Sequence, residues 1–158
     1  MSELHLSYLK LLRELTGSLE QLSELAQRKV ECVHESDLIA LDEVLKQEQA
    51  MTLNLRGVEQ KRLKLVSQLG LEDVSLAELD SKYPDELQLQ ARETSEALRQ
   101  SYEMYRSRAD AARNILEVNL HQIEKVIAAS GVDPGTLGAG YEVPGTEPPR
   151  RMKTDFRA

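Results

Sequence analysis

Apolar side chains near the start of the chain recur at alternating steps of four and three residues. The series is Tyr8, Leu12, Leu15, Leu19, Leu22 and Ala26. An α-helix completes a turn about every 3.6 residues, so these side chains share one stripe along an amphipathic helix. We expect this first helix over residues 2–33, with its stripe packed against other helices.

The stripe changes phase after Val33, because the next apolar residue of the pattern is Leu38, five positions further on. Ser36 and Asp37 can accept hydrogen bonds from the free N–H groups at the start of a new helix. We therefore predict a tight turn near Ser36, with a kink as the alternative, and an antiparallel hairpin of the first two helices. The second helix is predicted to stop at Gly70. Its stripe consists of Leu38, Leu41, Leu45, Thr52, Leu55, Val66 and Leu69.

The segment after Gly70 is predicted to form a short helix and then a third long helix. Ser75 and Glu78 fit an S-x-x-E capping box ahead of about two helical turns, and Pro84 suits the first position of the third helix. That helix is predicted to end at Gly131, which makes it roughly 70 Å long. Its stripe consists of Leu87, Ala91, Thr94, Leu98, Ser101, Tyr105, Ala112, Ile115, Asn119 and Val126.

Three long helices and one short helix predict an all-α fold, an elongated antiparallel helical bundle with a coiled-coil hairpin. The composition agrees, since only 4% of the residues are aromatic and Leu dominates the apolar residues. We expect one helical domain over residues 1–130. Residues 131–158 contain four of the five Pro and five of the eight Gly residues, which predicts a flexible C-terminal tail.

The charge and hydropathy of the chain exclude several classes of partner. A formal net charge of −7 disfavours binding to nucleic acids and adsorption to anionic membranes. No apolar run approaches the roughly 20 residues that span a bilayer, and the first residues lack the basic segment of a signal peptide. The single cysteine, Cys32, can form no internal disulfide. We expect a cytoplasmic protein that neither binds nucleic acid nor inserts into a membrane.

Sequence signals of catalysis or of a bound metal are weak. The chain has no Gly-rich phosphate loop, no H-E-x-x-H motif and no nucleophile elbow. Cys32, His34 and Glu35 stand close together near the predicted turn, but no second pair of ligands completes a tetrahedral set. The other two histidines, His5 and His121, are distant in the sequence. We therefore expect no catalytic residue, no metal and no cofactor.

Two charged residues, Glu48 and Arg62, lie on or beside the stripe of the second helix. A buried polar residue at such a position can fix the register of two helices. The interpretation that we favour is that their charged ends reach solvent while their methylene groups lie beside the apolar stripe.

The end of the predicted third helix has more apolar surface than one helix contact needs. Its apolar side chains cover an arc of roughly 200°, whereas about 100° suits a single core-facing stripe. One interpretation is a helix packed between two others. The other is a groove for the amphipathic helix of another protein. The candidate binding residues are Tyr102, Tyr105, Ile115, Leu116, Asn119, Leu120, Ile123, Val126 and Ile127.

The order of these elements resembles the flagellar FlgN family, the type III secretion chaperones for hook-associated proteins, over residues 4–130. The stretch "SDLIALDEVLKQEQAMTLNLRGVEQKRLKLVSQLG" is similar to the second helix of that family, and "VSLAEL" is similar to its short helix. The residues that match in the second helix are Leu41, Leu45, Glu48, Gln49, Leu55, Glu59 and Arg62. The stretch "ILEVNLHQI" resembles the family's client-binding helix, although the position that carries Asn in the family falls on Ala112 here.

The resemblance implies that the chain holds the terminal helices of unassembled hook-associated proteins. Such a chaperone prevents premature polymerisation and delivers its clients to components of the flagellar export apparatus. The alternative is a structural coiled-coil subunit or tether that self-associates through the apolar stripe of the third helix. A chaperone binds a client helix in a defined ratio, whereas a tether forms a stable oligomer. The sequence is compatible with a monomer and with a dimer.

Overall fold

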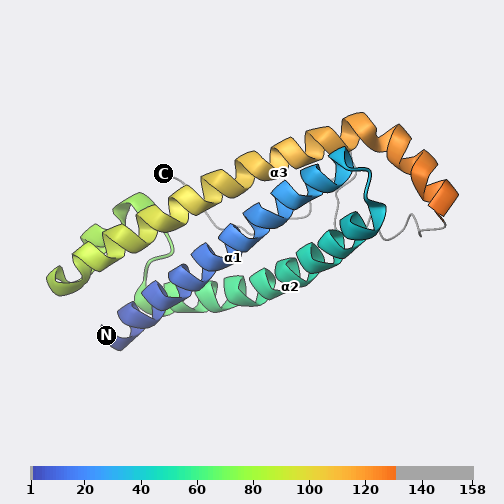
Figure 1. Ribbon diagram of the computed structural model, residues 1–158. Helices are drawn as coiled ribbons and strands as arrows, with labels where there is room; N and C mark the ends of the chain where they lie inside the picture. Colours follow the sequence, from blue (N-terminus) through green and yellow to red (C-terminus); the bar gives the residue numbers. More distant parts are fainter. Residues whose placement is uncertain (1, 131–158) are drawn as a thin grey trace. The chain divides into compact units, whose positions relative to one another are not determined.

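The computed structural model describes the backbone of residues 2–130, and the side chains of residues 2–120, Glu124 and Ala128. Three long α-helices account for most of this part of the chain: α1 (Ser2–His34), α2 (Leu38–Leu69) and α3 (Gln88–Ser130) (Figure 1). Residues 2–130 contain no strand. The predicted all-α class is therefore confirmed, while the predicted tail over residues 131–158 lies outside the described residues.

The chain divides into two compact units. Within the described residues, the first unit comprises residues 2–20 and 54–103, and the second comprises residues 21–53 and 104–130. Each of the three long helices therefore contributes residues to both units.

The residue that caps the end of α1, Ser36, has a left-handed backbone conformation although it is not glycine. Ser36 has a φ of 54°. Its N–H donates to the carbonyl of Val33 over 3.2 Å, and the N–H of Asp37 donates to the carbonyl of Cys32 over 2.9 Å. This pair of bonds is the Schellman arrangement, which satisfies two carbonyls that the helix end leaves free.

The start of α2 is capped by Asp37. Its Oδ1 accepts a hydrogen bond of 3.0 Å from the N–H of Ala40, which satisfies one of the free N–H groups of the first turn. Of the two cap candidates in the sequence, Asp37 therefore caps α2, whereas Ser36 supplies the change of direction. The turn that the sequence predicts is present, and the alternative of a kink is wrong.

Replacing Ser36 by glycine is expected to stabilise the protein by about 1 kcal/mol, because glycine adopts a positive φ without the steric cost of a Cβ atom. The gain should appear as a rise of about 2–4 °C in the midpoint of thermal unfolding. Ser36→Ala is the control, since it keeps the Cβ atom and should give no such gain. A fall in the midpoint with glycine would contradict the left-handed cap.

Gly70 ends α2 in the predicted manner. Its φ is 68°. The N–H of Gly70 donates to the carbonyl of Ser67 over 3.2 Å, and the N–H of Leu71 donates to the carbonyl of Val66 over 2.9 Å. Leu71 is also buried, as is common for the residue that follows a left-handed cap.

The connection between α2 and α3 differs from the prediction of one short α-helix. It contains three single turns of 3₁₀ helix, η1 (Leu76–Glu78), η2 (Asp80–Lys82) and η3 (Asp85–Leu87). Ser75 makes no capping bond with its side chain; instead its carbonyl accepts from the N–H of Glu78 over 3.1 Å. Leu76 and Leu79 are both buried. Their spacing of three residues suits the 3₁₀ helix, in which about three residues make a turn.

The third long helix also begins later than predicted. Pro84 has extended backbone, with a ψ of 147°, and precedes η3, so α3 starts at Gln88 rather than at the proline. The carbonyl of Pro84 accepts from the N–H of Leu87 over 2.8 Å, so Pro84 begins the 3₁₀ turn η3 that precedes α3.

The predicted stripes form most of the core of each unit. All six residues of the first stripe are buried. In the second stripe Leu41, Leu45, Leu55 and Val66 are buried, whereas Thr52 is exposed and donates its hydroxyl to the carbonyl of Glu48 over 2.8 Å. The third stripe is buried at Ala91, Thr94, Leu98 and Ala112. Its remaining described members, Leu87, Ser101, Tyr105, Ile115 and Asn119, are half-buried.

Candidate functional site

The candidate binding residues on α3 differ in how far their own chain covers them. Leu116 is buried, with 9% of its surface exposed. Tyr102, Tyr105, Ile115 and Asn119 are half-buried. Leu120 is exposed over 51% of its surface. Tyr102 belongs to the first unit, and the other residues belong to the second. The side chains of Ile123, Val126 and Ile127 lie outside the described residues.

Leu120 is the candidate residue with the largest described apolar surface that another molecule can cover. It follows the buried Leu116 by one helical turn, so it lies beside the packed face of α3. Val118 is 83% exposed, but a separation of two residues points it to a different side of the helix. Leu120 therefore lies on the exposed side of α3 that borders the core of the second unit.

Asn119 is satisfied within α3 itself. Its Nδ2 donates a hydrogen bond of 2.8 Å to the carbonyl of Ile115, one turn earlier. An Asn side chain has a second N–H and an acceptor oxygen besides this donor, but a bond from a partner would replace one to water, so the net gain from such a contact would be small. The apolar surface is thus a stronger basis for binding here than the amide.

A buried ion pair joins α1 to α2 in the second unit. The Nζ of Lys29 lies 2.6 Å from a carboxylate oxygen of Glu48, and the two side chains are only 7% and 12% exposed. Our interpretation that the charged end of Glu48 reaches solvent is therefore wrong. The pair links residues on either side of the turn at residues 35–37, so the two helices are antiparallel in this unit.

The burial of Lys29 has a signal in the sequence that was not among the predictions. It continues the first stripe by the step of three that follows Ala26, and a basic residue on an otherwise apolar stripe calls for a buried acidic partner. Glu48 occupies the corresponding place on the second stripe, three residues after Leu45.

Arg62 is likewise paired, and only 13% of its side chain is exposed. Its guanidinium donates two hydrogen bonds to the carboxylate of Glu59, over 3.0 and 2.9 Å, and a third to the hydroxyl of Tyr8 over 3.4 Å. The interpretation that Arg62 reaches solvent is therefore also wrong. Burial raises the pKa of Tyr8, which the neighbouring guanidinium partly offsets, so the phenol stays protonated and joins α1 to α2 in the first unit.

Tyr83 connects the segment before α3 to α1. Its hydroxyl donates to the carbonyl of His5 over 3.0 Å, and its ring meets the His5 ring edge to face with centroids 4.6 Å apart. Burial raises the pKa of Tyr83, so this donor keeps its proton. These contacts hold the 3₁₀ turns against α1 within the first unit.

Of the residues near the turn, Cys32, His34 and Glu35, the cysteine has low reactivity. Cys32 is buried, and burial raises the pKa of its thiol, which lowers the fraction of reactive thiolate. Among the described side chains, those of residues 2–120, Glu124 and Ala128, no group of three His, Cys, Asp or Glu residues is arranged to hold a metal ion. None of the described helices is both long and apolar enough to cross a membrane.

In the described part of the chain, polar side chains within the helical units hold the helices together, and α3 retains exposed apolar side chains. The family model described as "FlgN protein" matches residues 5–149. The chain belongs to the FlgN family, a family of flagellar export chaperones that bind flagellar proteins and are not known as enzymes. Neither the comparison with curated proteins nor that with solved structures gives a match.

Proposed function

We propose that this chain is a cytoplasmic chaperone for hook-associated proteins of the flagellum. It binds the terminal amphipathic helix of such a protein, prevents its premature assembly and aids its delivery to the export apparatus. Membership of the FlgN family supports the chaperone role. The observation that carries the choice of a helical client is the exposed apolar flank of α3 at Leu120, beside the buried Leu116.

The client helix would lie along α3 in the second unit, where the expected antiparallel bundle leaves one flank of the helix open. Leu120 would then be covered, and the half-buried Ile115 and Tyr105 would complete the apolar contact. Ile123, Val126, Ile127 and Tyr102 belong to the proposal through their helical spacing alone. Asn119 would lie at the edge, where its bond to Ile115 can remain.

The expected affinity follows from the apolar surface that the client would cover. Complete burial of one Leu or Ile side chain contributes about 1.5–3 kcal/mol, and Leu120 has about half of its surface still to bury. Ordering of the client helix opposes this gain by about 2–5 kcal/mol. Several such contacts are therefore needed, and together they support dissociation constants in the micromolar to nanomolar range.

Leu120→Asp is expected to weaken client binding at least about tenfold, which corresponds to about 1.4 kcal/mol, because it places a charge in an apolar contact. Titration calorimetry of the full chain against the terminal peptide of a hook-associated protein measures the effect. The thermal unfolding midpoint should change little, since Leu120 is half exposed in the unbound protein.

Ile39→Asp is the matched control, because Ile39 is 79% exposed in the same unit but lies on α2. It should leave binding unchanged. If Leu120→Asp unfolds the protein, the flank belongs to the core. If the variant stays folded and binds normally, the client lies elsewhere. A stable self-assembled oligomer that does not bind the peptide would favour the structural tether.

A further inference from the structure

The exposed face of α2 in the first unit carries basic side chains and no exposed acidic one. Residues 54–69 form the green, C-terminal part of α2 (Figure 1). Arg56, Lys61 and Lys64 are exposed there, whereas Glu59, the only acidic residue of this stretch, is 8% exposed and bound to Arg62. The stretch has a net charge of +3, so the remaining residues together carry −10, against −7 for the whole chain.

The positive charge of this face is not neutralised by its neighbours. None of the ion pairs among the described side chains involves Arg56, Lys61 or Lys64. The positions three and four residues away from the two lysines hold no acidic residue, although these are the positions that meet on a helix surface. The only acidic neighbour of Arg56 at that spacing is Glu59, whose carboxylate Arg62 already binds. The face can therefore attract an anionic group from outside.

Gly57 lies among these side chains and is also exposed. A Cβ atom added at Gly57 would meet nothing within 4 Å beyond its own turn of the helix, so packing among the described residues does not require a glycine. Glycine is less favourable than alanine inside a helix, because it loses more backbone freedom on folding. The missing side chain leaves backbone that another molecule can approach closely.

We propose that this face binds an acidic amphipathic helix of another protein. It consists of Arg56, Gly57, Lys61, Leu63 and Lys64 and is called the basic face below. Gly57, Lys61 and Lys64 follow each other by four and three residues, so they form one stripe along α2. A helix laid along this stripe would approach α2 closely at Gly57 and place carboxylates, at its own steps of three and four residues, against the two ammonium groups. Leu63, which is 49% exposed, would be covered at the edge.

An acidic helix fits the basic face better than other anionic surfaces do. From Arg56 to Lys64 the face extends about 12 Å along α2, which is the length of roughly two turns of a partner helix. The net charge of −7 repels the dense phosphates of nucleic acids and the surface of anionic membranes, whereas a short acidic helix carries few charges and offers apolar side chains to Leu63. Exposed ion pairs contribute little one by one, so the complex should be weak and should dissociate as salt screens the charges.

Fluorescence anisotropy with a synthetic acidic helix tests the basic face. The probe is a labelled, alanine-rich peptide of about 18 residues, long enough to be helical, with glutamate at alternating steps of three and four residues. It should bind the full chain at low ionic strength, and Arg56→Glu/Lys61→Glu/Lys64→Glu should weaken that binding at least about tenfold. A lack of binding by the unaltered chain would overturn the proposal.

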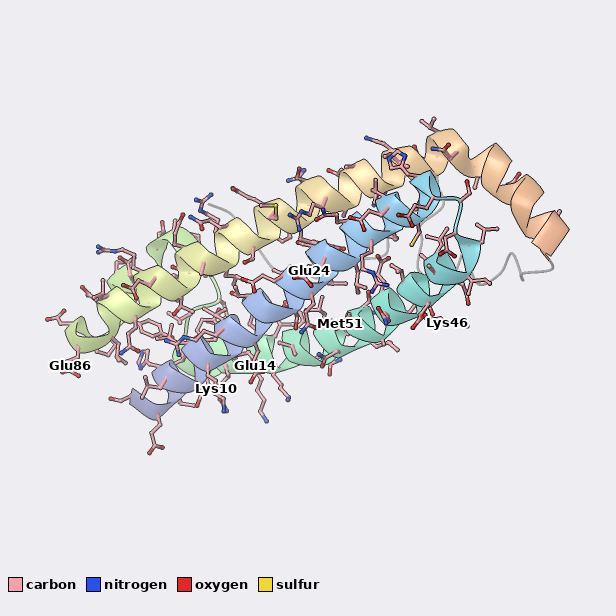
Figure 2. The ribbon with its side chains drawn as sticks, viewed as in Figure 1. Lys10, Glu14, Glu24, Lys46, Met51 and Glu86 are labelled. Carbon is pink, nitrogen blue, oxygen red and sulfur yellow. The ribbon has the colours of Figure 1, made fainter. Side chains whose placement is uncertain are left out.

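The matched control changes the net charge by the same amount elsewhere in the first unit. Lys10→Glu/Arg13→Glu/Lys82→Glu replaces three exposed basic residues (Figure 2 labels Lys10), and it should weaken binding by less than about threefold. Both variants should retain the circular dichroism of the unaltered chain, because all of the replaced side chains are exposed. Equal weakening by the two variants would show a response to net charge alone and would also overturn the proposal.

A second variant tests the close approach of a helix without changing any charge. Gly57→Gln fills the open space with a residue that favours helix, so the midpoint of thermal unfolding should rise by about 2–4 °C. Binding of the acidic peptide should nevertheless weaken several-fold, because the new side chain separates the two helices. Ala97→Gln, at an exposed position of α3 in the same unit, should leave binding unchanged. Unchanged binding by Gly57→Gln would contradict a helix packed against the basic face.

Other anionic partners are distinguished with the same triple glutamate variant of the basic face. A short DNA duplex and phosphatidylserine vesicles should bind the unaltered chain more weakly than the acidic peptide does at the same ionic strength. Tighter binding of either one, lost in the triple variant, would contradict the acidic helix. A salt-sensitive dimer in light scattering that the triple variant abolishes would assign the basic face to a second copy of the chain and would likewise contradict the proposal.

The basic face does not depend on the proposed chaperone function. Leu120 belongs to the second unit and the basic face to the first, so the triple variant should bind the client peptide as the unaltered chain does. Loss of client binding in calorimetry of that variant would contradict a separate docking surface. Binding of the acidic peptide by a chain that binds no client would instead contradict only the chaperone function.

Discussion

Lys29→Met is expected to destabilise the protein by about 3–5 kcal/mol, because it leaves the carboxylate of Glu48 buried without its cation. The two side chains are only 7% and 12% exposed, and their charged atoms are 2.6 Å apart. In a chain of this size, 1 kcal/mol shifts the midpoint of thermal unfolding by about 2–4 °C. Circular dichroism should therefore record a midpoint lower by roughly 6–20 °C.

Two further variants separate the buried pair from a general effect of removing a lysine. Lys29→Met/Glu48→Leu removes both charges and should recover most of the lost stability. Lys46→Met removes an exposed lysine that pairs with Asp42 along α2 (Lys46 is labelled in Figure 2), and its cost should stay below about 1 kcal/mol. A small effect of Lys29→Met, equal to that of Lys46→Met, would contradict the burial of the pair.

Leu98→Ala is expected to cost about 2–5 kcal/mol, since it removes a side chain that is fully buried in the first unit and leaves a cavity. Urea denaturation measures this as a lower midpoint with an unchanged slope. Leu89→Ala is the control on the same helix, because Leu89 is 63% exposed; its cost should stay within about 0.5 kcal/mol. Equal costs for the two variants would show that α3 is not packed at Leu98.

The long helices could be predicted because their signals are local and periodic. The series from Tyr8 to Ala26 follows the helical repeat, and all of its members are buried. α1 and α2 end where Ser36 and Gly70 adopt a positive φ, a conformation that glycine at a helix end favours. The connection after Gly70 was predicted less well, because an α-helix and successive 3₁₀ turns begin with the same residue types and differ by one residue in their hydrogen bonds.

The buried charges could not be assigned from single positions. Glu48 and Arg62 each suit an exposed place beside a stripe, and only the approach of Lys29 or Glu59 makes burial favourable. The partner of Glu48 was identifiable only when positions on two stripes were compared together, whereas Glu59 lies three residues before Arg62 on the same helix. Lys29 continues the first stripe and Glu48 continues the second.

The candidate site depends even more on tertiary structure. Leu116 and Leu120 are the same residue type one turn apart, yet one is buried and the other half exposed. Sequence spacing places both on a broad apolar arc, but neighbouring helices decide which part of the arc they cover. The distinction between buried and exposed positions on this arc therefore requires the structure.

The central proposal is best tested by mixing the purified full chain with a purified hook-associated protein and measuring the mass of the product by light scattering. We expect a complex of defined ratio that disappears when the terminal helix of the hook-associated protein is removed. A failure to form any complex, or a complex that persists without that helix, would contradict it.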